Sequence, residues 1–480
     1  MNNITRRSFL KDSFLTAAAL SVPVHSWGRV LGANDDIRIA IIGFNGRGKD
    51  HIEGIRKLPG VRIVALCDVD SNVLEREAQK LRDLSQPVET YTDVRKLLEN
   101  KDVDAISTAT PNHWHSLIAV WACQAGKDVY VEKPVSHNVW EGRKIVEAAR
   151  KYKRIVQTGT QSRSSTGLKE AIQYLHDGQL GKIKLVRGLC YKRRASIGKV
   201  DGEQTVPSSI DYNLWTGPAP LVPLHRKNLH YDWHWVWPTG NGDLGNQGIH
   251  QMDIARWALN ANELSPQVFS IGGRLGYVDD AETPNTEIVF HNYQAAPLIF
   301  EVRGLPSHAG SDKMGQYRGA SIGVVIDCDH GYMVIPNYTG ANVYDLDGNE
   351  IKKFDGGGNH YANFFKAVRS RRPGDLNAEI LEGHLSSALC HTGNISYRLG
   401  AEKNPREIFD AIKSDKEATE SFGRFEEHLA VNGVDLVKTK ATVGAFLKMN
   451  PKSERFTNNT KANEMLTRDY RHPFVVPEKV

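Results

Sequence analysis

The feature that most constrains this chain is a short apolar run that leads directly into a glycine-rich turn. The run Ile39 to Ile42 is uninterrupted and rich in β-branched residues, as expected for a strand buried on both faces of a parallel sheet. Glycines at 43, 46 and 48 follow, and residues 49–58 can form a helix. These elements together form a seat for a pyrophosphate, because glycines let the backbone approach the ligand and the first helical N–H groups point at its charge.

The next apolar run ends in an acid at the position that a dinucleotide site requires. Residues 61–67 lead to Asp68, twenty positions after Gly48. A carboxylate there can accept hydrogen bonds from the adenosine ribose, and no Arg or Lys follows at 69 or 70 to neutralise an extra phosphate. We therefore predict NAD, with NADP less favoured. The predicted turn contacts are Gly43, Phe44, Asn45, Gly46, Arg47 and Gly48, with Asn45 as the non-glycine best able to adopt a positive φ.

Strand-like and helix-like segments alternate from residue 34 to 157, which predicts an NAD-binding Rossmann domain with a doubly wound parallel sheet. Ligands of such sheets bind beyond the carboxyl ends of the strands. The segments 43–48, 110–115 and 132–134 should therefore line one crevice. We add to the predicted cofactor site Thr110, Pro111, Asn112, His115, Glu132 and Lys133.

After residue 157 the pattern changes to extended segments with few helices between them. It predicts a C-terminal α+β domain over 158–400 with a largely antiparallel open sheet, so the whole chain is of the α/β class. A loop-rich aromatic insert occupies 194–245, and 401–480 is a polar extension, expected to be helical with a tail over the domain or a neighbouring subunit. A chain of 480 residues is too long for one compact core.

Two residues in separate motifs are suited to proton and hydride chemistry. Lys133 follows a predicted strand, where a lysine beside a nicotinamide ring could stabilise the alkoxide of a substrate hydroxyl. His250 lies in a predicted helix starting near Gly248, and imidazole accepts protons near neutral pH. Asp253 would share its helical face. Taken singly, the lysine could equally be an exposed loop cation and the histidine a structural one.

Three motifs in this order resemble the Gfo/Idh/MocA family, named after glucose–fructose oxidoreductase, inositol dehydrogenase and a rhizopine-catabolism protein. They are the turn 43–48, the Glu-Lys-Pro triplet 132–134 and Gly-Ile-His-Gln-Met-Asp at 248–253. The resemblance covers about residues 37–400 and implies sugar or polyol substrates and an open sheet that often mediates homo-oligomers. By position it makes Lys133 and His250 the catalytic pair. Asn246 stands where the family often has an acid, so it could only orient a substrate.

The insert is rich in aromatic residues that suit a sugar. Trp233, Trp235 and Trp237 are spaced by two, which puts three indoles on one face if the segment is extended. They could equally form the insert's own small core. A metal site at His230, Asp232 and His234 is a poor match to known signatures, so no metal is predicted. The predicted substrate contacts are Arg163, Tyr191, Lys192, Trp233, Trp235, Trp237, Asn246, His250 and Asp253.

The N-terminus predicts export. Residues 1–33 hold paired arginines followed by Ser-Phe-Leu-Lys and a short apolar run, which resembles a twin-arginine signal. The less favoured alternative is a disordered basic start. Five unclustered cysteines fit a protein that crosses the membrane already folded, contacting it only transiently, and reaches the periplasm. The net charge of +5 is small for this length, and the basic residues are scattered along the chain. This pattern does not indicate nucleic-acid binding.

The predicted function is NAD-dependent oxidation or reduction of a hydroxyl on a sugar, polyol or glycoside. Because an exported enzyme has no cytoplasmic pool to recharge a free cofactor, we expect NAD to be tightly held and to return to its starting redox state in each cycle. One alternative is glycoside cleavage by transient oxidation, a branch known in the family that usually lacks the Glu-Lys-Pro triplet. Another is a non-catalytic sugar-binding protein on the same fold.

Overall fold

The computed structural model describes residues 36–480, so the predicted export signal at 1–33 lies outside the described residues. The first sheet has six parallel strands in the order β3-β2-β1-β4-β5-β6, which confirms the predicted doubly wound sheet. The strands are β1 (Ile37–Ile42), β2 (Val61–Cys67), β3 (Glu89–Tyr91), β4 (Ala105–Thr108), β5 (Asp128–Val131) and β6 (Val156–Thr158).

Alternating side chains of β1 build two separate cores. Ile39 and Ile41 pack with α2 (Gly48–Ile55), α3 (Ser71–Asp83) and α12 (His360–Ser370). Ala40 and Ile42 belong to the core on the other face, with α4 (Val94–Glu99), α5 (His115–Gln124) and α6 (Val139–Lys151). Both faces of the strand are therefore buried from solvent, as its uninterrupted apolar sequence predicts.

The second sheet is largely antiparallel, as predicted; among its strands in residues 36–480, β7 and β10 are the one pair that runs parallel. Its central strands run in the order β14-β13-β12-β11-β7-β10-β9-β8. They are β7 (Ile183–Tyr191), β8 (Gln267–Gly273), β9 (Thr286–Asn292), β10 (Pro297–Arg303), β11 (Ile322–Cys328), β12 (Tyr332–Ile335), β13 (Gly340–Tyr344) and β14 (Glu350–Asp355).

The C-terminal extension is only partly helical. It contributes α14 (Pro405–Ile412) and α15 (Lys416–Ala430), followed by short strands. These are β15 (Ala401–Lys403), β16 (Ala441–Val443), β17 (Leu447–Asn450) and β18 (Arg455–Phe456), of which β16 and β17 pair with β8. Strands of two to four residues show no periodicity, which is why the sequence pattern did not reveal them.

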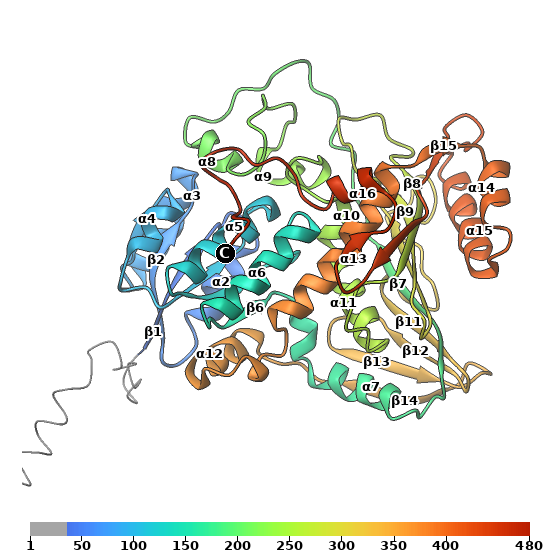
Figure 1. The fold of residues 1–480 in the computed structure, drawn as a ribbon, viewed down its shortest axis with the longest axis horizontal. Coiled ribbons are helices and arrows are strands. Elements are labelled where there is room, and N and C mark those ends of the chain that lie inside the picture. Colours follow the sequence, from blue (N-terminus) through green and yellow to red (C-terminus); the bar gives the residue numbers. More distant parts are fainter. Residues whose placement is uncertain (1–35) are drawn as a thin grey trace, which may run out of the picture. The chain divides into compact units, whose positions relative to one another are not determined.

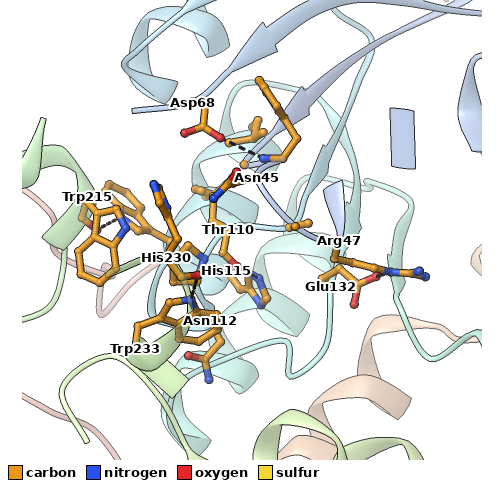
Figure 2. Close-up of a pocket in the computed structure, with 18 of the residues that line it drawn as sticks. Asn45, Arg47, Asp68, Thr110, Asn112, His115, Glu132, Trp215, His230 and Trp233 are labelled. Carbon is orange, nitrogen blue, oxygen red and sulfur yellow. Dashed lines mark hydrogen bonds and ion pairs between the residues drawn. The ribbon is translucent and has the colours of Figure 1, made fainter. Parts of the chain in front are cut away.

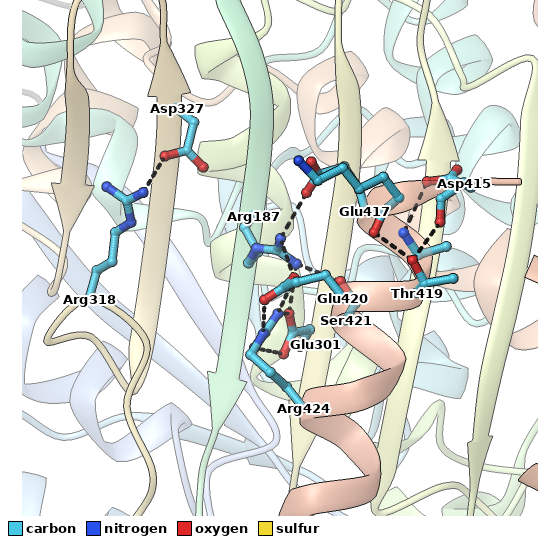
Figure 3. A network of polar contacts seen from close by, with 12 residues as sticks. Arg187, Glu301, Arg318, Asp327, Asp415, Glu417, Thr419, Glu420, Ser421 and Arg424 are labelled. Carbon is cyan, nitrogen blue, oxygen red and sulfur yellow. Dashed lines mark hydrogen bonds and ion pairs between the residues drawn. The ribbon is translucent and has the colours of Figure 1, made fainter. Parts of the chain in front are cut away.

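The two faces of the second sheet carry different helices (Figure 1). One face packs on α7 (Thr166–His176), α11 (Gly248–Ala258) and α13 (Ile380–Arg398) in a single large core. The other face receives α15, which is attached by a buried ion network around Glu301 of β10. Arg187 of β7 donates to Glu301 at 3.0 Å and Arg424 of α15 donates to it at 2.9 Å (Figure 3).

The insert and the C-terminal tail both return to the first sheet. The insert contains three short helices, α8 (Tyr212–Thr216), α9 (Leu229–Asp232) and α10 (Gly242–Asn246). After α16 (Thr460–Glu464), the tail, drawn dark red, runs past α8 and ends beside α5 (Figure 1). Phe474, Val476 and Val480 of the tail are buried in the core that contains α5.

All five cysteines are buried and free. Over residues 36–480, no helix combines the length and the apolar character that a membrane span requires.

Candidate functional site

A cavity of about 300 Å³ lies at the carboxyl ends of the parallel strands. Residues 43–47 of the glycine turn, Asp68, the segment 109–112 and the triplet 132–134 all line it, together with side chains of the insert (Figure 2). Gly48, the last residue of the turn, does not line it. The three chain segments predicted to meet in one crevice therefore do meet. This edge of the sheet is where the loops of a doubly wound fold place their ligand.

The glycine turn is shaped by two close approaches. Gly43 adopts a φ of +72°, and a Cβ there would lie 2.8 Å from the backbone of Thr110. A Cβ on Gly48 would lie 2.2 Å from the carbonyl oxygen of Gly43. The positive φ falls on Gly43 and not on Asn45, which corrects the expectation for that residue. The turn is thus closed tightly by glycine at its two ends.

The fold itself does not require a glycine at position 46. Gly46 lines the cavity, its φ is not positive, and a Cβ there would meet no protein atom within 4 Å. The space in front of Gly46 is therefore available to a ligand that lies against the backbone, which is what a pyrophosphate requires. Helix α2 begins just after it, and no side chain caps its N-terminus.

We expect Gly46→Ala to leave the melting temperature unchanged and to raise the dissociation constant for NAD at least tenfold, about 1.4 kcal/mol. The added methyl group meets no protein atom but occupies the space of the nucleotide. Isothermal titration with NAD measures the effect. Gly374→Ala, which also adds a methyl group in open space but lies outside the cavity lining, is the matched control. Equal NAD affinity in the two variants would contradict a nucleotide on this turn.

Arg47 and Glu132 connect the turn to the end of β5. Arg47 Nε donates to Glu132 Oε1 at 3.1 Å, and His51 Nε2 lies 3.0 Å from the same oxygen. Burial by itself would raise the pKa of Glu132, but the hydrogen bond with His51 and the charge of Arg47 hold it well below its usual value. Glu132 is therefore an anion that fixes the turn against the lysine loop.

Asp68 faces the cavity and also holds the turn. Its Oδ2 accepts the backbone N–H of Phe44 at 3.0 Å, and its Oδ1 accepts that of Asp70 at 3.1 Å. Burial raises the pKa of Asp68. Each carboxylate oxygen has a further lone pair, so the side chain can still accept a ribose hydroxyl.

The segment after β4 supplies the middle of the cavity wall. Thr110, Pro111, Asn112 and His115 all line it. His115 ties two loops together, with Nδ1 2.6 Å from the carbonyl oxygen of Pro134 and Nε2 2.8 Å from that of Thr110. Asn112 donates to Asn241 of the insert, and its Oδ1 is buried without a partner. An unpartnered amide oxygen beside the cavity is suited to accept a hydrogen bond from a ligand.

The predicted catalytic pair comes together around Asn246. Lys133 lines the cavity and its Nζ donates to the carbonyl oxygen of Asn246 at 3.0 Å. Burial lowers the pKa of Lys133. His250 lies one turn further along, behind the cavity wall, with its Nδ1 unpartnered. Burial and the nearby Lys133 charge lower the pKa of His250 to about 3, so its imidazole is neutral at pH 7.

Arg163 and Asp253, predicted to grip a substrate, are engaged elsewhere. Arg163 Nε donates to Asp253 Oδ2 at 2.8 Å, and Ser386 donates to the other carboxylate oxygen at 2.7 Å. Neither residue lines the cavity. They form a buried ion pair that joins the 3-10 turn Gln161–Ser164 to α11, so we correct their role to a structural one.

Tyr191 and Lys192 lie on opposite faces of the second sheet. Tyr191 is buried on the α15 face, where its hydroxyl donates to Glu301, and it does not line the cavity. Lys192 is on the α11 face, and its Nζ donates to Gln247 Oε1 at 2.8 Å. Lys192 thus contacts the residue after Asn246 without lining the cavity itself.

The three tryptophans do not form one aromatic face. Trp233 to Trp235 is a 3-10 turn and not an extended segment, so the spacing of two does not align the rings. Trp233 lines the cavity and stacks on His234 at 3.6 Å. Trp235 is buried under Arg194, and Trp237 packs against Tyr397, both outside the cavity lining.

Several cavity residues were missed by sequence reasoning. They come from the segment after β3 and from the insert, and they are Thr92, Asp93, Val94, Leu214, Trp215, His230, Tyr231, His234, Asn241 and Gly242. The many aromatic residues of the insert were the sequence signal for these contacts, but the sequence analysis interpreted them as a surface for a sugar.

His230 is held by Asp70, with Nε2 2.9 Å from Oδ2. Among residues 36–480 no three metal-ligating side chains gather into a metal site.

Comparisons with known proteins agree with this architecture. Residues 37–160 match the profile of the oxidoreductase family GFO_IDH_MocA with its NAD-binding Rossmann fold, and residues 181–424 match the C-terminal alpha/beta domain of that family. Glycosyl hydrolase family 109 protein 2 of Shewanella sp. (strain ANA-3) is 31% identical over 171 residues, 31% of this chain and 38% of the relative. A glycosyl hydrolase family 109 protein of Saccharopolyspora erythraea is 30% identical over 205 residues, 38% of this chain and 44% of the relative.

The chain thus spans 38–44% of the length of these two curated relatives. Among solved structures, the WlbA dehydrogenase from Bordetella pertussis, in complex with NADH and UDP-GlcNAcA, has a TM-score of 0.55 at 17% identity, covering 74% of this chain and 94% of the other. An oxidoreductase from Agrobacterium radiobacter, in complex with NAD+, L-tartaric acid and magnesium, has a TM-score of 0.53 at 14% identity, covering 74% and 95%. At these identities the likeness is one of fold.

Proposed function

This chain belongs to the Gfo/Idh/MocA oxidoreductase family, and from that premise we propose that it oxidises or reduces a hydroxyl of a sugar, polyol or glycoside with NAD. One observation supports this most strongly: a single cavity extends from the glycine turn to Lys133. A nucleotide on the turn and a substrate beside the lysine would therefore share one enclosed space. When bound, NAD would supply a hydride acceptor for the carbon that carries the hydroxyl.

Lys133 is placed to act on the substrate oxygen. The carbonyl oxygen of Asn246 orients its ammonium group at the cavity wall. An ammonium donor in a buried site stabilises the alkoxide that develops as hydride leaves the same carbon. This makes Lys133 the electrostatic catalyst, with Asn246 as the residue that positions it.

His250 is the proposed proton acceptor on the family resemblance; it does not line the cavity itself but follows Asn246, which does, by four residues. Its imidazole is neutral at physiological pH, and its Nδ1 has no hydrogen-bond partner, so a lone pair is available. Burial and Lys133 lower its pKa, which makes it a weaker base than a free imidazole. Tyr338 lies edge-on at 5.2 Å between ring centroids and holds the imidazole plane. Since Asn246 has no ionisable group, the proton would pass to His250 alone.

NAD is proposed over NADP because Asp68 is an acid at the ribose end of the cavity. A carboxylate there repels a ribose 2′-phosphate. Arg76 of α3 also reaches the turn, with Nη2 3.4 Å from Asn45 Oδ1. Its Nε is engaged by the buried carboxylate of Glu77 at 2.9 Å, which offsets its attraction for a second phosphate.

The second candidate is glycoside cleavage by oxidation, elimination and re-reduction. It is favoured by the two relatives named glycosyl hydrolase family 109 proteins. Oxidation, elimination and re-reduction returns the cofactor to its starting state. The first candidate does so only when the oxidation of one sugar is coupled to the reduction of a second sugar, which takes the hydride back from the cofactor. We propose one of these closed cycles, in an exported protein with a twin-arginine signal acting in the periplasm. We further propose a homo-oligomer, on the family resemblance.

The test is to incubate the purified protein with a panel of sugars, polyols and glycosides, with and without added NAD. Mass spectrometry scores the loss of two hydrogens and the release of an aglycone. Oxidised products without cleavage support the first candidate, and cleaved glycosides support the second. A protein that binds no nicotinamide nucleotide and changes no member of the panel would overturn both in favour of a sugar-binding protein.

A further inference from the structure

We propose that the insert forms the adenosine half of the cofactor site, and that the C-terminal tail holds the insert there so that NAD is retained between turnovers. The inference rests on the proposed function, because it assigns further residues to the same cavity. The insert side chains concerned are Trp215 and His230, and the tail side chains are Arg471 and Phe474.

The position of the insert along the sheet edge identifies which half of a dinucleotide it faces. Trp215 and His230 line the cavity together with Asp68 and residues 92–94, which follow β2 and β3. Lys133 follows β5, on the other side of β1 in the strand order. A dinucleotide with its ribose on Asp68 and its reactive ring at Lys133 would therefore place its adenosine against Trp215. Tyr212 stacks on Trp215 and Arg226 lies over its ring, so the part of the indole that lines the cavity is the surface left for a purine.

A second aromatic pair of the insert lines the same cavity. Trp233 and His234 stack on each other and line the cavity. Burial and the nearby charge of Lys133 lower the pKa of His234 to about 3. Trp233 also packs against the cluster that contains Trp215, and its Nε1 donates to the carbonyl oxygen of His230 at 3.1 Å. The aromatic residues of the insert therefore form one connected wall of the cavity, in which Trp215 and Trp233 are separate side chains (Figure 2).

The insert is fastened across the end of β2. Ser71 N donates to the carbonyl oxygen of Ser209 at 2.9 Å, and Asp211 N donates to that of Val69 at 3.1 Å. The His230–Asp70 contact at 2.9 Å adds a side-chain connection. Because these bonds close the cavity beside Asp68, release of an adenosine there requires this pairing to open.

A second set of bonds holds α8 from the side of α5. Trp114 Nε1 lies 3.0 Å from the carbonyl oxygens of both Leu214 and Trp215. His113 Nε2 lies 3.1 Å from the carbonyl oxygen of Trp215. Two side chains at the start of α5 thus fix the backbone that carries the proposed adenosine contact.

The tail supports the same backbone from outside. Phe474 packs edge-on against Trp114 with 5.4 Å between ring centroids. Arg471 donates to the carbonyl oxygen of Asn213 at 2.7 Å and to its side-chain oxygen at 2.6 Å. The tail therefore contacts both α8 and the tryptophan that holds α8, and it joins the last residues of the chain to the cofactor cavity.

The experiment measures exchange of bound NAD, not turnover. Full-length protein is loaded with NAD and mixed with excess isotopically labelled NAD, and the bound fraction is followed by rapid gel filtration and mass spectrometry. We expect Trp215→Leu and the double variant Arg471→Ala/Phe474→Ala to exchange at least about tenfold faster than the wild type, because affinity differences at one site lie mainly in the dissociation rate. His230→Ala should also exchange faster, whereas His230→Gln keeps a donor to Asp70 and should stay close to the wild type.

Two matched controls remove the same side chains elsewhere. Trp257→Leu removes a tryptophan of α11, and Arg406→Ala/Phe409→Ala removes the same pair of side chains from the exposed face of α14. Both should exchange at the wild-type rate, with circular dichroism confirming that each variant is folded. The inference would be overturned, and the proposed function left intact, if the wild type binds NAD normally and the folded tail variants and both His230 variants exchange it at the wild-type rate. A wild type that binds neither NAD nor NADP would overturn the proposed function as well.

Discussion

Lys133→Met should lower kcat by a factor of about 10² to 10⁴ while leaving the fold and NAD binding intact. The methionine fills a similar volume but carries no charge, so the alkoxide that forms on the substrate loses its only proposed cationic donor. The orienting contact with the Asn246 carbonyl oxygen is lost with it. Steady-state kinetics on the substrate found by the panel, with isothermal titration of NAD, separates chemistry from cofactor binding.

The chain offers a matched control at the other end of the same strand. Lys127 precedes β5 as Lys133 follows it, and its Nζ also donates to backbone carbonyl oxygens, those of Asn100 at 2.6 Å and Val103 at 2.7 Å. Lys127→Met should therefore reduce stability and leave kcat within about twofold of the wild type. If both variants lost the same fraction of kcat, Lys133 would have a structural role only.

Glu301→Gln should reduce the free energy of unfolding by about 3–5 kcal/mol at pH 7, since it removes the anion of a buried ion network. Arg187 is 1% exposed and donates to Glu301, and Arg424 of α15 donates to the same carboxylate (Figure 3). Without this carboxylate, the buried guanidinium of Arg187 loses its one buried anion among those it contacts and keeps only Glu420 and Glu417, whose side chains are 42% and 43% exposed. Urea denaturation followed by circular dichroism measures the loss.

The pH dependence of this contribution has a definite sign. Burial would raise the pKa of Glu301, but the charges of Arg424, Arg187 and Arg303 lower it to about 2. A depressed pKa stabilises the folded state above the unfolded value near 4.5, by about 3 kcal/mol, and this stabilisation is lost as pH falls toward 2. Unfolding measured at pH 6 and pH 3 should therefore show a smaller loss for Glu301→Gln than for the wild type.

The control for this network is the ion pair of Arg318 and Asp327, which Figure 3 also shows. Arg318 and Asp327 approach to 3.1 Å with 36% and 23% of their side chains exposed (Figure 3). Solvent screens such a pair, so Asp327→Asn should cost less than about 1 kcal/mol. A loss at Glu301 no larger than this would show that the network does not hold α15.

The sequence was sufficient for the first domain because its signals are local. The unbroken apolar run of β1, the glycine turn and the acid after β2 lie within 32 residues, and each is recognised without knowing any distant contact. The position of Lys133 followed from the same rule, since residues after parallel strands gather at one edge. The antiparallel second sheet was also evident, because its strands follow one another with few helices between them.

The errors arose where a role depends on a distant partner. The sequence offers Arg163 as a cation that could bind a substrate. In the structure it forms an ion pair with Asp253, which lies 90 positions away. Tyr191 and Lys192 are neighbours, and strand alternation puts them on opposite faces; only the packing of α11 and α15 decided which face meets the site. The tryptophans at 233–237 were misread because a compact 3-10 turn, not an extended segment, places them.

By itself the sequence determined that a dinucleotide turn, an acid and a lysine lie along one edge of a parallel sheet, because short-range patterning fixes strands and their order fixes that edge. Only the tertiary structure decided what covers this edge. The insert and the tail meet the cavity through contacts between residues about 100 to 260 positions apart, and such contacts leave no periodic trace in the sequence.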